Sequence, residues 1–549
     1  MVLFWCRRGK LGREALIRKS KTMSALFPHD HIEGEAFIAL PDQIRQQAVQ
    51  TPDKIAICDE TSVCDWSELL INCEELAKQL IVSGVTPGDN VALIGDLQVT
   101  TFTAFLSVLF AGACVVPLPA IASDAALSRM LLDSGASMVL STTEAAGRIT
   151  NVLGLDAGHR KIKRGAIDFT PPDDSWTDLR AAHPTAVDVT LPSLHADALF
   201  NIIYSSGTTG TPKGIVHDNL FRFRQMSRMH GTGVNENCTM FVSTAIYSNT
   251  TIMPALSVLS GGGTLVTKRK FEAKSYIETA RKNGVTHAML VPTLVQRLLA
   301  EPSFQTDSIP TLERTFVTAS PFATSVKSEA VTRWPGVIHE IYGMTEGGLT
   351  AMLDTSLNPN KLGSVGKPSP SAIIRIIDDA GSELPTGQVG EIIGHSNTMM
   401  LGYHKRPEQN SAVRIDMPDG LAYFRTGDLG RFDDDGFLYV VGRAKDVIIS
   451  GGFNIYATDL EDALLLHPDV NEAAVMGMPS AAWGETPVAA VVLSAGSDVS
   501  EADLISFANE QLGKAQRISA LKKLEKLPLN ALGKVVKSDL GKQLNGLVS

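Results

Sequence analysis

The sequence predicts an α/β fold with a large N-terminal domain of two α/β sheet layers, a small distorted β-barrel and a small mobile α+β C-terminal domain. Three observations predict it. Short apolar segments alternate with helical runs twice before residue 342, short strands separated by turns follow Gly363, and the last part of the chain mixes helices with strands. Strands that alternate with helices are typical of a mostly parallel sheet.

The first α/β region extends from about Pro41 to Pro119. It combines a helical run, Leu69–Val82, with the apolar strand candidates Val91–Ile94 and Cys114–Leu118. The longest apolar stretch, Phe102–Val116, is interrupted by two hydroxyl residues and is shorter than the roughly 20 residues that a membrane span needs. We therefore expect a buried helix that runs into a strand, and no transmembrane segment.

The alternation of helical runs and apolar strands is repeated between residues 199 and 341. The strand candidates are Met240–Val242, Thr264–Val266, His287–Val291 and Arg314–Thr318. This second run predicts the second α/β layer.

After Gly363 the strands become short and are separated by turns, which is typical of a small barrel or an antiparallel sheet. The strand candidates are Ile373–Ile377, Gly390–Ile393, Arg431–Phe432 and Phe437–Val441. The acidic turn Asp433–Gly436 raises the alternative of a calcium loop. An EF-hand needs alternate acidic positions before its glycine, and Arg431 occupies one of them, so we expect a hairpin turn.

The last part of the chain predicts a separate α+β lid. The helix candidates are Asp459–Leu466 and Glu501–Leu512, and the strand candidates are Ala473–Met478 and Val488–Leu493.

Composition limits the partners of the protein. The 549 residues are 44% hydrophobic and carry a net charge of −10, so no general attraction draws the chain to nucleic acid or to an anionic membrane. We expect a globular enzyme that acts on a small molecule. The six cysteines show no metal-ligand spacing and lie in the first half of the chain, which is typical of a reducing compartment and predicts a cytoplasmic location.

Residues 1–21 differ from the rest, because they carry seven Lys/Arg against one acid and lack the apolar core of a secretory signal. Three explanations stay open: a disordered basic arm, an upstream start codon with Met23 as the true first residue, and organellar targeting.

A loop rich in glycine and hydroxyl residues follows the apolar run Ala198–Ile203. Residues 204–217 read Tyr-Ser-Ser-Gly-Thr-Thr-Gly-Thr-Pro-Lys-Gly-Ile-Val-His. Glycines let backbone N–H groups turn toward an anion, and the hydroxyls and Lys213 add donors and charge. A Walker A loop is excluded, because Pro212 precedes the lysine and no hydroxyl follows it. The loop predicts a phosphate site of another kind.

This stretch resembles the hallmark of the adenylate-forming (ANL) superfamily, a Ser/Thr/Gly-rich loop that ends in Pro-Lys-Gly. The superfamily includes AMP-dependent acyl-CoA synthetases, luciferases and peptide-synthetase adenylation domains. The resemblance implies that the loop binds ATP and holds the leaving pyrophosphate. The residues concerned are Ser205, Ser206, Gly207, Thr208, Thr209, Gly210, Thr211 and Lys213.

A second motif, Glu-Ile-Tyr-Gly-Met-Thr-Glu-Gly-Gly at 340–348, also resembles the family. The resemblance implies that Tyr342 stacks on adenine, that Thr345 touches the α-phosphate and that Glu346 orders Mg²⁺. It assigns Ala319, Ser320 and Gly343 to the ATP site. It assigns Thr318, Gly343 and Met344 to the acyl pocket, where Thr-Ala-Ser-Pro at 318–321 replaces the usual Gly-Gly-Ala-Pro.

Four further motifs continue the resemblance to the end of the chain. Phe424–Asp428 and Gly442–Asp446 imply that Asp428 binds ribose, that Arg443 contacts ribose or phosphate and that Lys445 is the hinge. The segment 449–456 implies that Gly451, Gly452 and Phe453 help to form the pantetheine tunnel of CoA, although Ala457 stands where the family commonly has proline. Leu527–Lys534 implies that Lys534 is the catalytic lysine. The implied domains are an arm at 1–40, an adenylation domain at 41–443 and a lid at 444–549.

The segment Ser243–Asn249 bears on the acid. Tyr247 aligns with the aromatic gate of acyl-CoA ligases, and Ser248, or Asn249 if the register shifts by one, stands where amino-acid-activating members use aspartate. An amino-acid substrate is therefore disfavoured. No carrier-protein serine motif follows Lys534. We expect a small, medium-chain or aromatic acid.

The implied function is an ATP-dependent carboxylic acid:CoA ligase that acts on a fatty or aromatic acid in two steps with domain alternation. Mg²⁺ is the implied cofactor, ATP and CoA are the co-substrates, and a homodimer stays open. Two alternatives also stay open: an acyl-adenylate ligase that loads a carrier protein, and a non-catalytic nucleotide-binding homologue.

Overall fold

The computed structural model describes residues 25–548 with internal gaps. The residues outside the description after residue 24 are 28, 30, 31, 33, 34, 156, 157, 159–161, 172, 174, 180–187, 206–211, 452, 481, 514, 515, 531–533 and 549. Within the described ranges, each helix is too short or too polar to span a membrane.

The described residues form a first large sheet in the order β19-β9-β8-β4-β3-β5-β6-β7. Its strands are β3 (Asn90–Ile94), β4 (Cys114–Pro117), β5 (Met138–Ser141), β6 (Lys163–Ala166), β7 (Trp176–Asp178), β8 (Leu199–Ser205), β9 (Lys213–Asp218) and β19 (Gly402–Tyr403). The strands from β8 to β7 pair in parallel, whereas β9 returns antiparallel to β8. The phosphate-loop motif therefore connects the two strands of a hairpin.

A second large sheet has the order β16-β15-β14-β13-β12-β10-β11-β1-β2. Its strands are β1 (Ile55–Cys58), β2 (Val63–Asp65), β10 (Thr239–Val242), β11 (Thr264–Thr267), β12 (His287–Leu290), β13 (Arg314–Val317), β14 (Val337–Gly343), β15 (Thr350–Asp354) and β16 (Lys367–Pro368). The strands from β14 to β11 are parallel. Their carboxyl ends share one edge, which is where ligands bind in such sheets.

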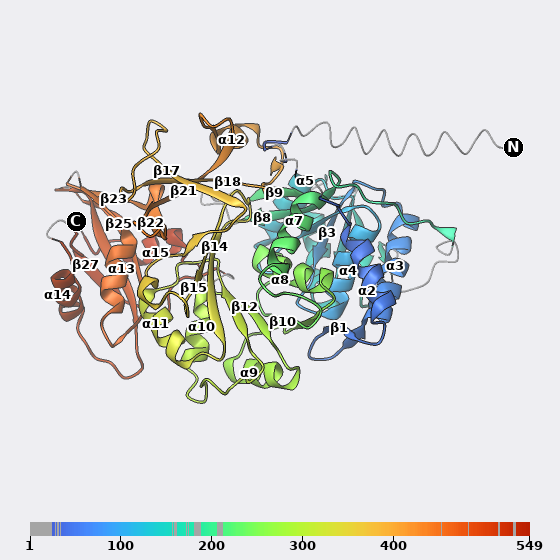
Figure 1. Ribbon diagram of the computed structural model, residues 1–549, viewed down its shortest axis with the longest axis horizontal. Helices are drawn as coiled ribbons and strands as arrows, with labels where there is room; N and C mark the ends of the chain where they lie inside the picture. Colours follow the sequence, from blue (N-terminus) through green and yellow to red (C-terminus); the bar gives the residue numbers. More distant parts are fainter. Residues whose placement is uncertain are drawn as a thin grey trace.

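Helices cover both sheets (Figure 1). They are α2 (Leu40–Gln50), α3 (Trp66–Val82), α4 (Val99–Phe110), α5 (Asp124–Ser134), α6 (Thr143–Gly154), α7 (Asn219–His230), α8 (Asn249–Ser260), α9 (Ala273–Lys282), α10 (Pro292–Leu299) and α11 (Thr324–Arg333). The predicted buried helix is confirmed: α4 is buried on nearly all sides and leads into β4. One hydrophobic core joins α4 and α8 with strands of both sheets, so the two layers form one domain.

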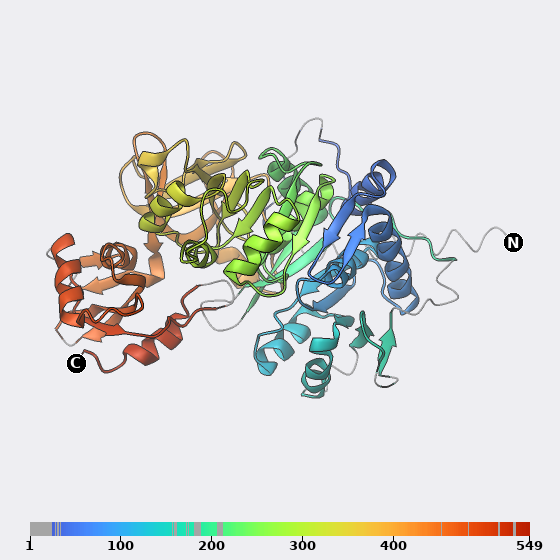
Figure 2. The same ribbon diagram turned by 90° about the horizontal axis from the view of Figure 1, so that it is seen from below.

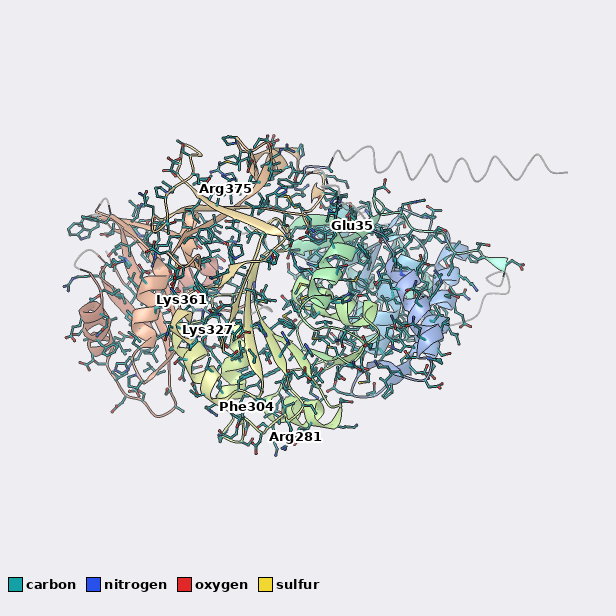
Figure 3. All side chains as sticks on the ribbon, viewed as in Figure 1. Glu35, Arg281, Phe304, Lys327, Lys361 and Arg375 are labelled. Carbon is teal, nitrogen blue, oxygen red and sulfur yellow. The ribbon has the colours of Figure 1, made fainter. Side chains whose placement is uncertain are left out.

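A smaller antiparallel sheet contains β17 (Ala372–Ile377), β18 (Gly390–Ser396), β20 (Arg414–Asp416), β21 (Ala422–Phe432) and β22 (Leu438–Arg443), and α12 (Pro407–Ala412) lies beside it. The predicted hairpin is confirmed, because the Asp433 N–H donates to Phe437 O at 3.0 Å. Lys361, labelled in Figure 3, binds Asp433 at 2.8 Å and Asp435 at 2.5 Å. Lys361 therefore pairs with two of the three carboxylates of this turn.

The small C-terminal domain lies at one end of the molecule, and a red segment extends from it toward the large domain (Figure 2). The short helix η4 (Ala444–Asp446) precedes it in the chain. Its elements are β23 (Ile448–Ser450), β24 (Phe453–Ile455), α13 (Ala457–Leu465), β25 (Val470–Ser480), β26 (Gly484–Leu493), α14 (Glu501–Gln511), β27 (Ala520–Lys523) and α15 (Lys537–Leu544).

Part of the expected N-terminal arm packs on the large domain. Phe27 is buried, the Leu26 N–H donates to Leu401 O at 2.9 Å, and His29 Nε2 lies 2.6 Å from Asp218 Oδ2. These described residues of the expected arm are held by contacts with the large domain. Residues 1–24 lie outside the description, so the three explanations for that stretch stay open.

Candidate active site

Three of the predicted nucleotide-binding residues contact one another. Asp428 on β21 and Arg443 on β22 are cross-strand partners, and Arg443 Nε lies 2.8 Å from Asp428 Oδ1. Tyr342, near the end of β14, donates its hydroxyl to Asp428 Oδ2 at 2.8 Å. A carboxylate offers about four lone-pair sites, so Asp428 can still accept from two ribose hydroxyls.

The protonation state of this group follows from its surroundings. Burial, and then the Asp428 carboxylate, raise the pKa of Tyr342 well above its usual value. Tyr342 therefore stays a neutral phenol, which can donate to Asp428 and present a flat ring to a base.

A tight turn at the end of β14 positions Thr345 and Glu346. The Gly347 N–H donates to Met344 O at 3.0 Å, and Gly347 has φ +75°. A Cβ at Gly347 would lie 2.1 Å from the Thr398 carbonyl oxygen, so only glycine fits. The turn is fixed by backbone packing.

Tyr403 joins this turn to the phosphate-loop hairpin, although the sequence analysis did not single it out. Its hydroxyl donates to Glu346 Oε1 at 2.9 Å, and Lys213 Nζ lies 5.0 Å from the centroid of its ring. Lys213 pairs with Ser205 across the hairpin. Tyr403 lies on a two-residue strand with no motif around it, so no signal in the chain pointed to it.

Six predicted ATP-binding residues cannot be placed. Ser206, Gly207, Thr208, Thr209, Gly210 and Thr211 lie outside the described residues.

His217 is a second residue that the sequence analysis did not assign to the site. It is fully buried, and its Nε2 donates to the Thr345 carbonyl at 2.7 Å. Its Nδ1 lies 3.1 Å from Asn201 Nδ2 and 3.2 Å from Arg222 Nη2, both of which can only donate, so Nε2 carries the proton. Burial, followed by Arg222, lowers the pKa of His217 well below its usual value. The sequence feature that could have identified His217 is its position as the last residue of the phosphate-loop motif.

Lys534 reaches this group from the small domain. The backbone of Lys534 is tied to Asn530: the Asn530 N–H donates to Lys534 O at 2.8 Å, and the Lys534 N–H donates to Asn530 Oδ1 at 3.0 Å. The residue as a whole is solvent-accessible, but protein atoms surround its ammonium. That enclosure, and then Arg443, lower the pKa of Lys534, whereas Asp428 and Glu346 raise it. Its charge therefore acts on the site in the large domain.

Ala319 takes a backbone conformation that favours glycine. It follows β13 and has φ +84°. The neighbouring Thr318 donates its hydroxyl to Ile341 O at 2.7 Å, which ties the ends of β13 and β14 together. Ser320 continues this loop at the carboxyl edge of the sheet. Backbone strain of this kind collects at functional sites.

The predicted acyl-binding segment leads into α8 on the same edge. Burial raises the pKa of Tyr247 to about 12, so this side chain stays neutral. Ser248 is the N-cap of α8 and accepts from the Thr250 N–H at 3.2 Å. The Ser248 hydroxyl is thus engaged by the helix.

The comparison with known families decides the class. The AMP-binding enzyme family matches residues 44–404, and the AMP-binding enzyme C-terminal domain matches residues 459–534. The chain belongs to the AMP-binding enzyme family. The resemblance to the adenylate-forming superfamily is thereby confirmed, and the protein is an AMP-forming acid–thiol ligase.

Relatives and solved structures agree with this assignment. The chain is 30% identical to a 2-succinylbenzoate–CoA ligase of Geobacillus kaustophilus, over 91% of this chain and 97% of that protein. It is 30% identical to a sulfoacetate–CoA ligase of Cupriavidus necator, over 92% and 97%. The o-succinylbenzoate CoA synthetase of Bacillus subtilis, solved with its acyl-adenylate intermediate, is 26% identical with a TM-score of 0.78, over 92% and 98%. The predicted architecture is confirmed by this likeness.

In this AMP-binding enzyme, one described carboxylate suits a magnesium ion. No group of three or more metal-ligating side chains occurs among the described residues. Mg²⁺ usually keeps several waters and needs only one or two carboxylates beside the phosphates of its substrate. Glu346 fits that requirement.

The predicted hinge residue of the AMP-binding enzyme lies beside the Asp428 group, two residues after Arg443, and the predicted CoA residues follow it in the chain. Lys445 lies in η4, and burial, ahead of the charges around it, lowers its pKa. The Gly451 N–H donates to Trp483 O at 2.9 Å, and Phe453 is exposed on β24. Gly452 lies outside the described residues.

Proposed function

We propose that the protein joins a carboxylic acid to CoA through an acyl-adenylate, at the expense of ATP. The observation that carries the proposal is the position of Lys534, whose ammonium comes from the small domain and acts on Asp428 and Glu346 of the large domain. A cation in this position can stabilise negative charge on a reacting carboxylate and on an α-phosphate.

In the first step, the acid's carboxylate attacks the α-phosphorus of ATP and pyrophosphate leaves. Tyr342 and Asp428 hold the nucleoside, and Lys213 holds the departing phosphates. Thr345 contacts the α-phosphate. Glu346 would hold Mg²⁺, which when bound neutralises phosphate charge. Such chemistry asks the protein mainly for positioning and charge, so no general base is required.

In the second step, a thiol attacks the mixed anhydride and AMP leaves. The small domain turns about Lys445, which withdraws Lys534 and brings the Gly451–Phe453 segment to the site. Phe453 is 61% exposed, so it is free to make a new contact. Domain alternation of this kind separates the two half-reactions.

The test is formation of AMP and pyrophosphate with a panel of fatty and aromatic acids, with and without CoA. Acyl-CoA should appear only when acid, ATP and CoA are all present. Adenylation that never responds to CoA would refute CoA as the acceptor.

A carrier protein is the second candidate acceptor. A fatty acid–[acyl-carrier-protein] ligase of Streptomyces coeruleorubidus is 27% identical over 90% of this chain. This alternative predicts pyrophosphate exchange with transfer only to a phosphopantetheinylated protein. Transfer to free CoA decides against it.

A cytoplasmic location and a homodimer complete the proposal. The described cysteines, Cys58, Cys64, Cys73, Cys114 and Cys238, are free and buried, which suits a reducing compartment. Cell fractionation tests the location, and the mass of the protein in solution tests the dimer.

A further inference from the structure

Arg222 on α7 is fully buried, and its guanidinium contacts only uncharged partners. Its Nε donates to Asn201 Oδ1 at 2.8 Å. Its Nη1 donates to Gln225 Oε1 at 2.5 Å and to Asn249 Oδ1 at 2.7 Å, and its Nη2 donates to His217 Nδ1 at 3.2 Å. Among the described residues, no carboxylate pairs with it. A buried cation without a counter-ion is costly.

The neighbouring arginine on α7 shows the usual arrangement. Arg224 Nη2 lies 2.7 Å from the carboxylate of Glu35, which Figure 3 labels beside this helix. The acid closest to Arg222 in sequence, Asp218, is committed elsewhere: it accepts from the Phe221 N–H at 2.8 Å and contacts His29. The positive charge of Arg222 therefore has no counter-ion among its described hydrogen-bond partners, and an anion from outside the protein could supply one.

Asn249 connects Arg222 to the acyl-binding segment, because its side-chain oxygen accepts a hydrogen bond from the guanidinium. Arginine has only donors, so the amide oxygen of Asn249 must face Arg222 and the amide nitrogen must point away. Asn249 is half-buried, and within the described part of the chain its Nδ2 has no hydrogen-bond partner. Two N–H donors are thus available beside a buried cation.

The position of Asn249 relates these donors to the reaction. Asn249 is the first residue of α8, a helix of 12 residues whose N-terminus also favours negative charge. This helix follows β10 at the edge where β14 ends in Gly343, one residue after Tyr342. Arg222 itself is two hydrogen bonds from the Thr345 carbonyl, through His217. The acid's far end and its reacting carboxylate can therefore be held by one connected network.

We propose that Arg222 and Asn249 select an acid that carries a second anionic group, a carboxylate or a sulfonate, remote from the carboxylate that is activated. The inference rests on the proposed function. Asn249 Nδ2 donates to the anionic group, and Arg222 supplies the balancing charge behind it. The same charge repels an ammonium group, so amino acids are excluded by electrostatics. Ser248, which caps α8, has no part in this selection.

The test compares AMP formation from acids of equal chain length whose far end is a carboxylate, a sulfonate, a methyl or an ammonium group. The carboxylate and sulfonate acids should have kcat/KM at least about tenfold above the methyl acid, and the ammonium acid should be the poorest. If only the carboxylate acid or only the sulfonate acid is preferred over the methyl acid, the result shows which anionic group the site binds. A methyl acid that is as good as both anionic acids overturns the inference.

The variant Asn249→Asp replaces the amide of the proposed subsite with a carboxylate of nearly the same shape, so a donor of hydrogen bonds becomes a negative charge. The new carboxylate lies at the Arg222 guanidinium and forms an ion pair, so the melting temperature should not fall. The preference for the anionic acid over the methyl acid should fall by at least about tenfold. Asn237→Asp, which adds the same charge at an exposed site, should leave the preference unchanged.

The two proposals fail in different ways. If no acid of any kind yields AMP, the proposed function fails and this inference fails with it. If methyl acids are activated without a preference for anionic ones, or if Asn249→Asp leaves the preference unchanged, only the inference about Arg222 and Asn249 fails.

Discussion

Replacing Lys534 by alanine removes the charge that the small domain brings to the large one. The Lys534 ammonium acts on Asp428 and Glu346, and the backbone of Lys534 is held by Asn530, independently of the lysine side chain. The substitution should therefore leave the fold and the ATP site in place. It should reduce the rate of adenylation.

The size of the loss follows from the local charges. Two unit charges 4 Å apart interact by about 4 kcal/mol at an effective dielectric constant near 20. Arg443 lies in the same group and retains its positive charge, so part of that stabilisation survives. We expect a loss of about 3–4 kcal/mol in the transition state, or about 10²- to 10³-fold in rate.

The assay separates the two half-reactions. Adenylation is followed as pyrophosphate release, and the second step is followed by supplying acyl-adenylate and CoA directly. Lys534→Ala should slow only the first, and the Kd for ATP should change little. Lys542→Ala is the matched control, because Lys542 is an exposed lysine of the same domain and its ion pair among the described residues is with Asp539 at 2.7 Å.

Unchanged adenylation in Lys534→Ala would refute the role assigned to this lysine. An equal loss in both half-reactions would refute the view that Lys534 withdraws before the thiol attacks.

Three further predictions concern the fold that supports the site. Ala319→Gly should raise the free energy of unfolding by about 1 kcal/mol, because Ala319 has φ +84°; denaturant unfolding that shows no gain contradicts this. His217→Leu should lower it by about 3 kcal/mol, because the Thr345 carbonyl and Arg222 each lose a buried partner; a loss below about 1 kcal/mol contradicts this. Burial raises the pKa of Glu461 to about 7 in the folded protein. The free energy of unfolding should therefore fall from pH 4.5 to pH 7, because over this range the unfolded state has released the proton that the folded state still binds. Water reaches part of the side chain, which limits the effect to about 2 kcal/mol, and Glu461→Gln should abolish it in urea unfolding measured against pH.

Most of the fold could be predicted from local patterns. The apolar strand candidates correspond to β3, β4 and β10 to β13, because buried parallel strands are continuous apolar runs bounded by turns. The acidic hairpin was predicted correctly because its turn residues carry their own geometry. What local patterns could not give is the order of the strands, which depends on pairing between residues far apart in the chain.

Motifs in the sequence pointed to Tyr342, Asp428 and Lys534, which the structure brings into one group, and their roles stay predictions. Tyr403 and Arg222 were missed for a physical reason. Each acts through a contact across the fold, Tyr403 on Glu346 and Arg222 on Asn249, and neither stands in a pattern that indicates such a contact. A buried arginine without a carboxylate is visible only once burial and partners are known.

The central claim is that the acid attacks the α-phosphorus of ATP. Labelling both carboxylate oxygens of an active acid with ¹⁸O tests it most directly, with the position of the label read by mass spectrometry after turnover with CoA. The account predicts one labelled oxygen in AMP, none in pyrophosphate and one in the acyl-CoA. Label in pyrophosphate, or AMP without label, would contradict an acyl-adenylate and with it the roles proposed for Lys213 and Lys534.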